Sequence, residues 1–218
     1  MKVKLVCFDW DGTLAKFPAK SSWELIENEL GATADAEKLR AMFYNNETDF
    51  LRWCDECVNL FKKFNLTKRK LAEILEKNFS LHKGVLETIN QLKAKGIKTG
   101  IISGGLANTY EYIANKSGLA VDYITFATKL EFDAASGKLI GGTKVNSDFQ
   151  GKVDILKSYC KKERISLEEV LYVGNEHNDI PVFRVCKGVA FSSDSEELKK
   201  QAKYVLEDAD MRGLLAYV

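Results

Sequence analysis

Proline is scarce in this chain: Pro18 and Pro181 are the only two among 218 residues, so few helices or strands are forced to break. A surplus of either charge is also missing, because 32 Lys and Arg balance 31 Asp and Glu to a formal net charge of +1. This balance argues against a protein built around nucleic-acid phosphates, which requires a basic surplus. No apolar run approaches the roughly 18 residues that a membrane span requires, so we expect no membrane partner.

Cysteine is sparse as well: the chain has five, an odd number, and they are widely scattered. This pattern argues against a secreted disulfide scaffold and predicts a cytoplasmic protein. Cys54 and Cys57 form a C-x-x-C pair, but both fall in a predicted helix and no second Cys or His pair lies near, which favours packing over metal binding. The apolar segment Val3–Phe8 is short and runs directly into acidic residues, so we expect no targeting segment.

Two patterns divide the chain. From residue 84 onward, strand-like and helix-like segments alternate, which is typical of an α/β fold with a doubly wound, mostly parallel sheet and helices on both faces. The predicted strands are 2–8, 97–102, 122–126, 170–173, 189–191 and 204–206, and the predicted helices are 85–95, 106–116, 152–163, 181–186, 196–202 and 211–217. Residues 128–132 and 138–140 predict a β-hairpin. Asp148 is a candidate N-cap for the helix that carries Lys152.

The segment between these parts is predicted to be all-helical, with no convincing strand from residue 15 to 81. We therefore expect an α/β core formed by residues 1–16 and 84–218, and a helical insert at 17–83, which we call the cap. Ser21 or Ser22 is expected to cap the first of its helices and Thr67 the last. Trp23 and Trp53 either line a pocket in the cap or pack between its helices, and the sequence leaves both open.

Acidic residues follow the first strand. In a parallel sheet the ligand crevice lies beyond the carboxyl ends of the strands. Asp9 and Asp11 are two residues apart there, so in extended backbone their side chains lie on one side, roughly 7 Å apart, with Trp10 pointing the other way. Two carboxylates so close require a cation or a shared proton. They can also divide the work of a nucleophile and a proton shuttle.

Three further segments at strand or helix ends complete a possible phosphate site. The amides and hydroxyl of Ser103-Gly104-Gly105 suit an anion, and Lys152 at a helix start could reach the same anion. The loop that follows residue 174 contributes oxygen ligands of the kind that Mg²⁺ prefers, namely Asn175, Glu176 and Asp179. Each segment alone is more often a turn, a cap or a solvated lysine. Together they describe a phosphoryl-transfer site.

These motifs resemble those of the haloacid dehalogenase (HAD) superfamily, in its phosphoserine-phosphatase-like branch. The first motif is Asp-Trp-Asp-Gly-Thr-Leu at 9–14, the second Ser103-Gly104-Gly105, the third Lys152, and the fourth Gly-Asn-Glu-His-Asn-Asp at 174–179. The resemblance extends from Val3 to about Tyr204, and the helical cap is also similar to that branch.

The resemblance implies a reaction. Asp9 would be the nucleophile that becomes an aspartyl-phosphate, and Asp11 would protonate the leaving oxygen and then activate water. The residues implied to hold substrate phosphate are Ser103, Gly104, Lys152 and Asn178. The residues implied to hold or support Mg²⁺ are Asp9, Asp11, Asn175 and Asp179. The implied partner is a small phosphorylated metabolite, and the protein is expected to be a monomer or a homodimer.

Two departures from the family pattern leave alternatives open. Asn175 stands where the family has a metal-binding Asp, and a lost unit charge near the ion is worth on the order of a few kcal/mol at an effective dielectric near 20. A weakly active or non-catalytic phospho-ligand module is therefore the second interpretation. Glu24 and Arg52 lie near, but out of register with, the cap residues that bind phosphoserine. A different small phosphomonoester is thus favoured, and neither its identity nor the acceptor of the phosphate follows from the sequence.

Overall fold

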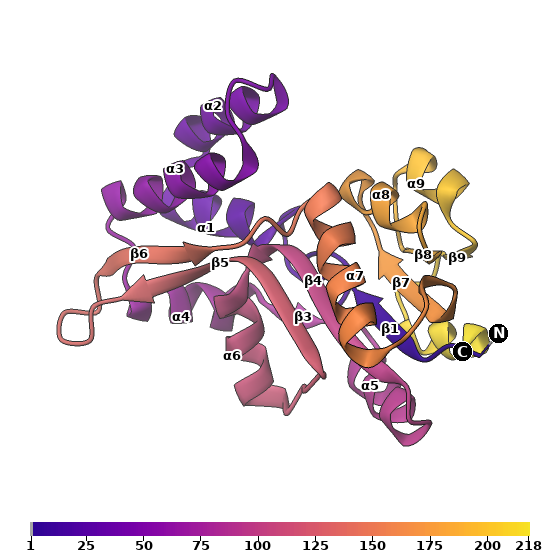
Figure 1. Ribbon diagram of the computed structural model, residues 1–218. Coiled ribbons are helices and arrows are strands. Elements are labelled where there is room, and N and C mark those ends of the chain that lie inside the picture. The colour runs from indigo at the N-terminus through magenta and orange to yellow at the C-terminus, as the bar shows by residue number, and fades with distance from the viewer. Residues whose placement is uncertain (1) are drawn as a thin grey trace.

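The computed structural model describes residues 2–218 and has a central seven-stranded sheet in the order β6-β5-β4-β1-β7-β8-β9. All neighbouring strands are parallel except β5 and β6. The strands are β1 (Leu5–Phe8), β4 (Lys98–Leu106), β5 (Tyr123–Phe132), β6 (Leu139–Lys144), β7 (Val170–Gly174), β8 (Lys187–Phe191) and β9 (Tyr204–Leu206). The predicted doubly wound α/β fold is confirmed (Figure 1).

Helices cover both faces of this sheet. The helices of the core are α5 (Val85–Ala94), α6 (Ala107–Ser117), α7 (Gln150–Glu163), α8 (Ile180–Phe183) and α9 (Glu196–Gln201), with 3₁₀ turns at Leu167–Glu169, His177–Asp179 and Met211–Tyr217. In β1, Val6 and Phe8 pack in one hydrophobic cluster with α5 and α6, whereas Leu5 and Cys7 pack in another with α7 to α9. Alternate residues of β1 are thus buried on opposite faces, as in a central parallel strand.

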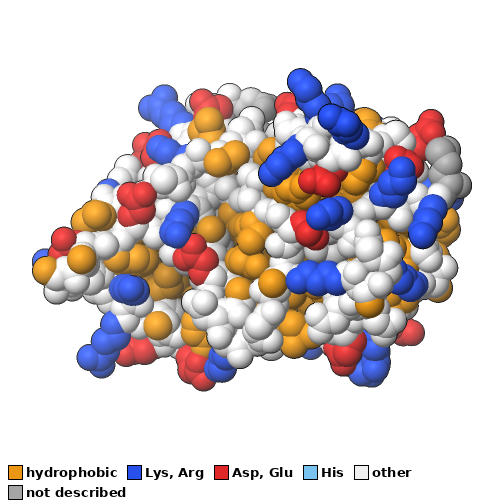
Figure 2. All heavy atoms as spheres, turned by 60° about the horizontal axis from the view of Figure 1, so that its bottom comes forward, with side chains coloured by type: hydrophobic (Ala, Val, Ile, Leu, Met, Phe, Trp, Pro, Cys, Tyr) orange, Lys and Arg blue, Asp and Glu red, His pale blue; other side chains and the backbone are white. Residues whose placement is uncertain are grey.

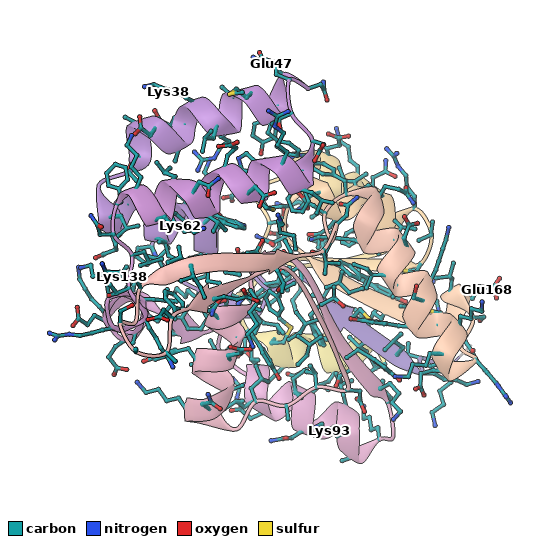
Figure 3. The ribbon with its side chains drawn as sticks, turned by 60° about the vertical axis from the view of Figure 1, so that its left-hand side comes forward. Lys38, Glu47, Lys62, Lys93, Lys138 and Glu168 are labelled. Atoms are coloured by element: carbon teal, nitrogen blue, oxygen red, sulfur yellow. The ribbon has the colours of Figure 1, made fainter. Side chains whose placement is uncertain are left out.

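The cap contains four helices, α1 (Ser22–Leu30), α2 (Thr33–Tyr44), α3 (Phe50–Lys63) and α4 (Lys68–Asn78). Ser21 caps α1 and Thr67 caps α4, as predicted, because each side chain accepts a hydrogen bond from a first-turn amide. Figure 3 shows α2 as the outermost helix, with Lys38 on its outer side and Glu47 in the turn that follows it. Cys54 and Cys57 are buried free thiols in α3, which confirms the packing interpretation.

The prediction that residues 15–81 hold no strand is wrong. β2 (Ala15–Lys16) and β3 (Ser80–Leu81) pair antiparallel at the two junctions between core and cap. Each strand has two residues, too few for periodicity, and their pairing depends on residues 64 and 66 positions apart in sequence meeting in space. The cap boundaries at residues 17 and 83 stay a prediction. The ribbon lies close to both, because it pairs residues 15–16 with 80–81.

Several predicted boundaries also change. Segments 122–126 and 128–132 form the single strand β5, whose partner β6 extends to Lys144, so the predicted hairpin is longer than expected. β4 continues to Leu106, so α6 begins one residue later than predicted. The 211–217 segment is 3₁₀ rather than α-helical. Asp148 does not cap α7, whose N-cap is Phe149, because the Asp148 carboxylate accepts a hydrogen bond from Asn178.

Across residues 2–218, no helix is long and apolar enough to pass through a bilayer.

Candidate active site

The turn after β1 presents the two predicted acids. Asp9 is 4% exposed, and its amide donates to Val173 O at 2.8 Å, which fixes it to the end of β7. Gly12 has φ +76°, a left-handed conformation that lets the chain reverse directly after Asp11. Trp10 points away from both acids, as predicted, and its Nε1 donates to Thr109 Oγ1 at 2.8 Å. Both carboxylates line the same cavity.

Burial governs the ionisation of both acids. It raises the pKa of Asp9 to about 7, although the ammonium of Lys152 acts in the opposite direction. Burial also raises the pKa of Asp11 to about 6, opposed by hydrogen bonds from Ser22. Both the amide and the hydroxyl of Ser22 donate to Asp11 Oδ2 at 2.8 Å, while Asp11 Oδ1 is buried and has no hydrogen-bond partner among residues 2–218. The two acids therefore sit in different environments, which suits different roles.

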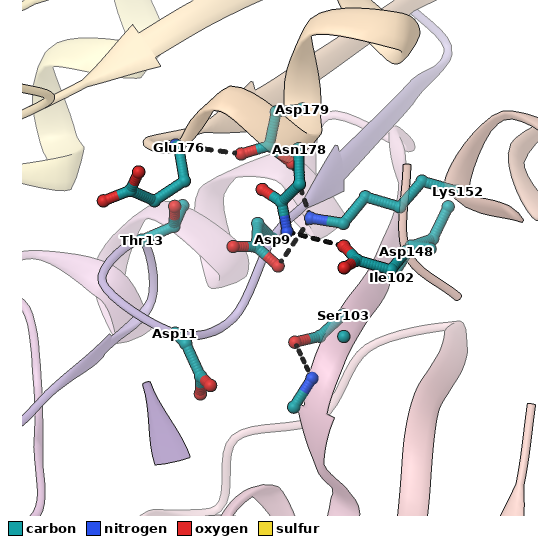
Figure 4. A network of polar contacts seen from close by, with 12 residues as sticks. Asp9, Asp11, Thr13, Ile102, Ser103, Asp148, Lys152, Glu176, Asn178 and Asp179 are labelled. Carbon is teal, nitrogen blue, oxygen red and sulfur yellow. Dashed lines mark hydrogen bonds and ion pairs between the residues drawn. The ribbon is translucent and has the colours of Figure 1, made fainter. Parts of the chain in front are cut away.

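Lys152 lies at the centre of the network in Figure 4 and is fully buried on α7. Its Nζ is 3.1 Å from Asp9 Oδ1 and 2.6 Å from Asp179 Oδ1. Burial alone would lower the pKa of this ammonium, but the carboxylates of Asp179 and Asp9 outweigh it, so the pKa is raised and Lys152 stays charged. The core therefore holds a buried cation next to the Asp9 carboxylate.

Asp179 uses both of its carboxylate oxygens within the protein. Oδ1 accepts from Lys152 Nζ and from the hydroxyl of Tyr172 at 3.1 Å. Oδ2 accepts from the amides of Asn175 at 3.0 Å and Glu176 at 3.2 Å. Four such bonds fill the lone pairs of a carboxylate. These four bonds hold Asp179 in the core beside the Asn175 loop, a position that fits the support of the metal shell implied by the resemblance.

The loop after β7 also positions two amide side chains. Asn175 Oδ1 accepts from Thr13 Oγ1 at 2.9 Å, which joins the first and fourth motifs. Asn178 Nδ2 donates to Asp148 Oδ1 at 2.6 Å, and its Oδ1 is buried with no partner within residues 2–218. The amide of Asn178 is thus oriented by Asp148, which also lines the cavity. This role of Asp148 was not predicted, because its one signal in the sequence is an acid four residues before Lys152.

The second motif closes the cavity from β4. Ser103 is 1% exposed, and its Oγ accepts from the amide of Gly105 at 3.1 Å. A Cβ atom on Gly105 would come within 2.6 Å of Asp11 Oδ2, so only glycine allows this approach. The carbonyl of Gly104 accepts from Trp23 Nε1 at 2.9 Å, which fastens α1 of the cap to the motif.

Core and cap enclose one cavity of about 470 Å³ between them. Its polar floor is formed by Asp9, Asp11, Ser103, Gly104, Asp148 and Asn178. Its cap side is formed by Lys20, Trp23, Glu24, Arg40, Phe43, Tyr44, Phe50 and Trp53. The sequence left open whether Trp23 and Trp53 pack between the cap helices or line a pocket. They do both, because they pack against each other and line the cavity. Glu24 lines the cavity but Arg52 does not. Arg40, which was not among the predicted residues, lines it instead.

The chemistry of the floor fits a hard cation. The buried carboxylates of Asp9, Asp11 and Asp179, with the partly buried one of Asp148, outnumber the buried cation Lys152. No three His, Cys, Asp or Glu side chains converge as a metal cluster within the part of the chain described. The donors implied for Mg²⁺ include only one of these side-chain types, the Asp9 carboxylate. The other two are carbonyl oxygens, from the Asp11 backbone and the Asn175 side-chain amide. Mg²⁺ accepts both kinds of oxygen ligand alongside water.

Comparisons with known proteins agree with this geometry. The family model of haloacid dehalogenase-like hydrolases matches residues 3–186. The phosphoserine phosphatase of Lactococcus lactis subsp. lactis is 30% identical over 98% of this chain and 94% of its own length. That of Methanocaldococcus jannaschii is 29% identical over 100% and 98%. A solved structure of a phospho-aspartyl intermediate analogue of phosphoserine phosphatase superposes with a TM-score of 0.79 at 28% identity, covering both chains fully.

This chain belongs to the haloacid dehalogenase-like hydrolases. Within them it is similar to the phosphoserine-phosphatase-like branch, as its motifs indicated, and it is an enzyme of the phosphatase class.

Proposed function

We propose that this enzyme is a Mg²⁺-dependent phosphatase that hydrolyses a small phosphomonoester through an aspartyl-phosphate on Asp9. The observation that carries the proposal is the Asp9 carboxylate on the cavity floor, aligned by the buried ammonium of Lys152. We further propose that the protein acts in the cytoplasm on a phosphorylated metabolite. Its state as monomer or homodimer remains a prediction.

In the first half-reaction, an Asp9 oxygen attacks phosphorus and the bond from phosphorus to the alcohol oxygen breaks. Asp11 gives its proton to the departing alcohol, a role that a pKa of about 6 supports because the protonated form is present near neutral pH. In the second half-reaction, Asp11 takes a proton from water, the water oxygen attacks phosphorus, and inorganic phosphate leaves Asp9. Asp11 ends protonated, ready for the next turnover.

Four residues are proposed to bind the phosphate, namely Ser103, Gly104, Lys152 and Asn178. Lys152 supports the developing negative charge because its own charge is fixed by Asp179. Bound Mg²⁺ would neutralise phosphate oxygens, and Asp9, the Asp11 carbonyl and Asn175 are proposed to hold it, with Asp179 supporting the loop. Trp23 fastens the cap over the floor, which supports exclusion of water during the first step.

The test is the variant Asp9→Asn, assayed for Mg²⁺-dependent release of p-nitrophenol from p-nitrophenyl phosphate. We expect loss of at least about a thousandfold in kcat, because an amide cannot form the acyl phosphate. The matched control is Asp154→Asn, which changes an exposed acid on α7 and should keep full activity.

Full activity in Asp9→Asn would refute the assignment of the nucleophile. The second candidate, a non-catalytic phospho-ligand module, is favoured by the uncharged Asn175. Wild-type protein with neither turnover nor a Mg²⁺-dependent rise in melting temperature would support that candidate.

A further inference from the structure

The cap side of the cavity is a wall of aromatic rings. We infer that the organic part of the substrate carries an aromatic ring, so that the natural substrate is a phosphate ester of an alcohol attached to a flat ring. This inference rests on the proposed phosphatase function and specifies the leaving group.

The wall is continuous. Its central ring, Trp53, lies 5.2 Å from Trp23, 5.8 Å from Phe43 and 5.9 Å from Phe50, measured between ring centroids. Trp23 and Trp53 are buried, whereas Phe43 and Phe50 are only partly buried and both line the cavity. Two aromatic side chains therefore leave part of their surface facing the space above the phosphate floor.

Helix α2 contributes three side chains to the lining of the cavity. Arg40, Phe43 and Tyr44 are three and four residues apart, a spacing that puts them on one face of a helix, and all three line the cavity. Tyr44 is 58% exposed, and its ring lies 6.4 Å from that of His177 in the fourth-motif loop. The aromatic surface thus extends from the cap to the catalytic loop, where it would flank a bound leaving group.

Two of the polar side chains on the cap side, Arg40 and Glu24, already have partners, which disfavours a charged head group at these two positions. Arg40 is paired with the buried carboxylate of Glu27 at 2.5 Å. A substrate carboxylate would have to compete with Glu27, whose side chain is 1% exposed. Glu24 already accepts a hydrogen bond from the amide of Lys20. The apolar part of the wall, by contrast, has no competing partner to displace.

The size of the cavity agrees with a ring-bearing substrate. A volume of about 470 Å³ falls within the range typical for ligands well above the size of a phosphorylated three-carbon compound. Stacking or edge-to-face contact with Phe43 or Phe50 would add affinity beyond that of the buried apolar area. A small aliphatic substrate would leave the same rings facing water.

The experiment compares kcat/KM for benzyl phosphate, n-propyl phosphate and O-phosphoserine with Mg²⁺ present. All three are esters of primary alcohols, so phenolic leaving groups do not bias the result. For the wild type we expect benzyl phosphate to exceed propyl phosphate and phosphoserine by about tenfold, the size of one or two aromatic contacts.

Two variants locate the effect. Phe43→Leu and Phe50→Leu keep an apolar side chain of similar volume but remove the ring. Each should lower kcat/KM for benzyl phosphate by about three- to tenfold and change that for propyl phosphate less than about twofold. The control Phe64→Leu removes a ring of the cap that packs in a separate cluster and should preserve the benzyl-to-propyl ratio.

The outcomes separate the inference from the proposed function. Mg²⁺-dependent turnover with phosphoserine or propyl phosphate at or above benzyl phosphate would overturn the inference and leave the phosphatase function intact. Absence of turnover with all three esters and with p-nitrophenyl phosphate would overturn both. Because the first comparison uses only wild-type protein, a variant that fails to fold does not affect it.

Discussion

Among single residues, Asn175 separates this chain most clearly from the family pattern. Its side-chain oxygen accepts a hydrogen bond from Thr13, so the amide is held in place and the oxygen keeps a second lone pair. An amide oxygen can still ligate Mg²⁺, but it lacks the charge of a carboxylate. The position is therefore organised for an oxygen ligand of reduced strength.

Restoring the charge should strengthen metal binding. We expect Asn175→Asp to lower the Kd for Mg²⁺ by about tenfold or more, since a carboxylate adds a Coulombic attraction of a few kcal/mol before desolvation. The measurement is the rise in melting temperature on adding Mg²⁺, which should be larger in the variant than in the wild type. Asn146→Asp, at an exposed position, is the charge control. Unchanged or weaker Mg²⁺ affinity in Asn175→Asp would mean that Asn175 is not a ligand.

Asp148 is the second residue whose role can be tested by itself. It holds the side-chain amide of Asn178, which is proposed to contact the phosphate. Asp148→Ala should lower kcat/KM by about tenfold or more, as is usual when a partner of a substrate-binding group is removed. Asp148→Asn keeps an acceptor oxygen and should recover much of that loss. Equal activity in all three proteins, with equal melting temperatures, would show that Asn178 does not depend on Asp148.

At the level of elements, the ribbon of β2 and β3 joins core and cap, and His82 follows it directly. The amide of His82 donates to Leu14 O at 3.0 Å, and its ring packs edge-on against Phe191 with centroids 5.2 Å apart. Burial lowers the pKa of His82, and the charge of Lys16 adds to the effect. The imidazole is therefore favoured in its neutral form when the protein is folded.

This depressed pKa predicts the sign of a pH effect on stability. The unfolded chain binds a proton on His82 below about pH 6.5, whereas the folded protein resists it. The stability that depends on neutral His82 is thus present above that pH and is lost as pH falls through the lowered pKa. We expect the difference in melting temperature, wild type minus His82→Gln, to be smaller at about pH 5 than at about pH 8. A difference that grows on acidification would contradict this assignment.

At the scale of the whole molecule, core and cap share a hydrophobic cluster. Cap residues such as Trp23 and Phe61 pack in it with Leu106 and Leu130 of the central sheet. An ion pair between Lys144 of β6 and Asp55 of α3 adds a polar contact across the same junction. Part of the apolar surface of the cap helices is therefore buried against the core. On the face seen in Figure 2, basic and acidic side chains are interspersed, in keeping with the balanced composition.

This shared cluster predicts that core and cap unfold together. Differential scanning calorimetry of the full chain should give one transition whose calorimetric and van't Hoff enthalpies agree. The reason is that loss of the cap would expose Leu106 and Leu130 of the core, and loss of the core would expose the cap helices. A separate, earlier transition assigned to the cap would contradict the prediction.

The sequence alone determined the fold class and placed several candidate site residues at the ends of strands and helices. Asp9, Ser103, Lys152 and Asn175 were predictable because each follows a strand or begins a helix, and parallel strands bring their carboxyl ends to one edge of a sheet. Short-range patterns carry that information: a buried apolar run, a turn residue and a polar side chain within a few positions.

Tertiary structure alone decided the remainder. The contact of Asp148 with Asn178 joins residues 30 apart in sequence, and the hydrogen bond of Trp23 to Gly104 joins residues 81 apart. The aromatic wall and the position of Arg40 follow from how α2 and α3 pack over the sheet. The β2–β3 ribbon forms because the chain leaves the cap close to where it entered it. Such contacts leave no local period in the sequence, because their energy comes from surfaces that meet only after the chain has folded.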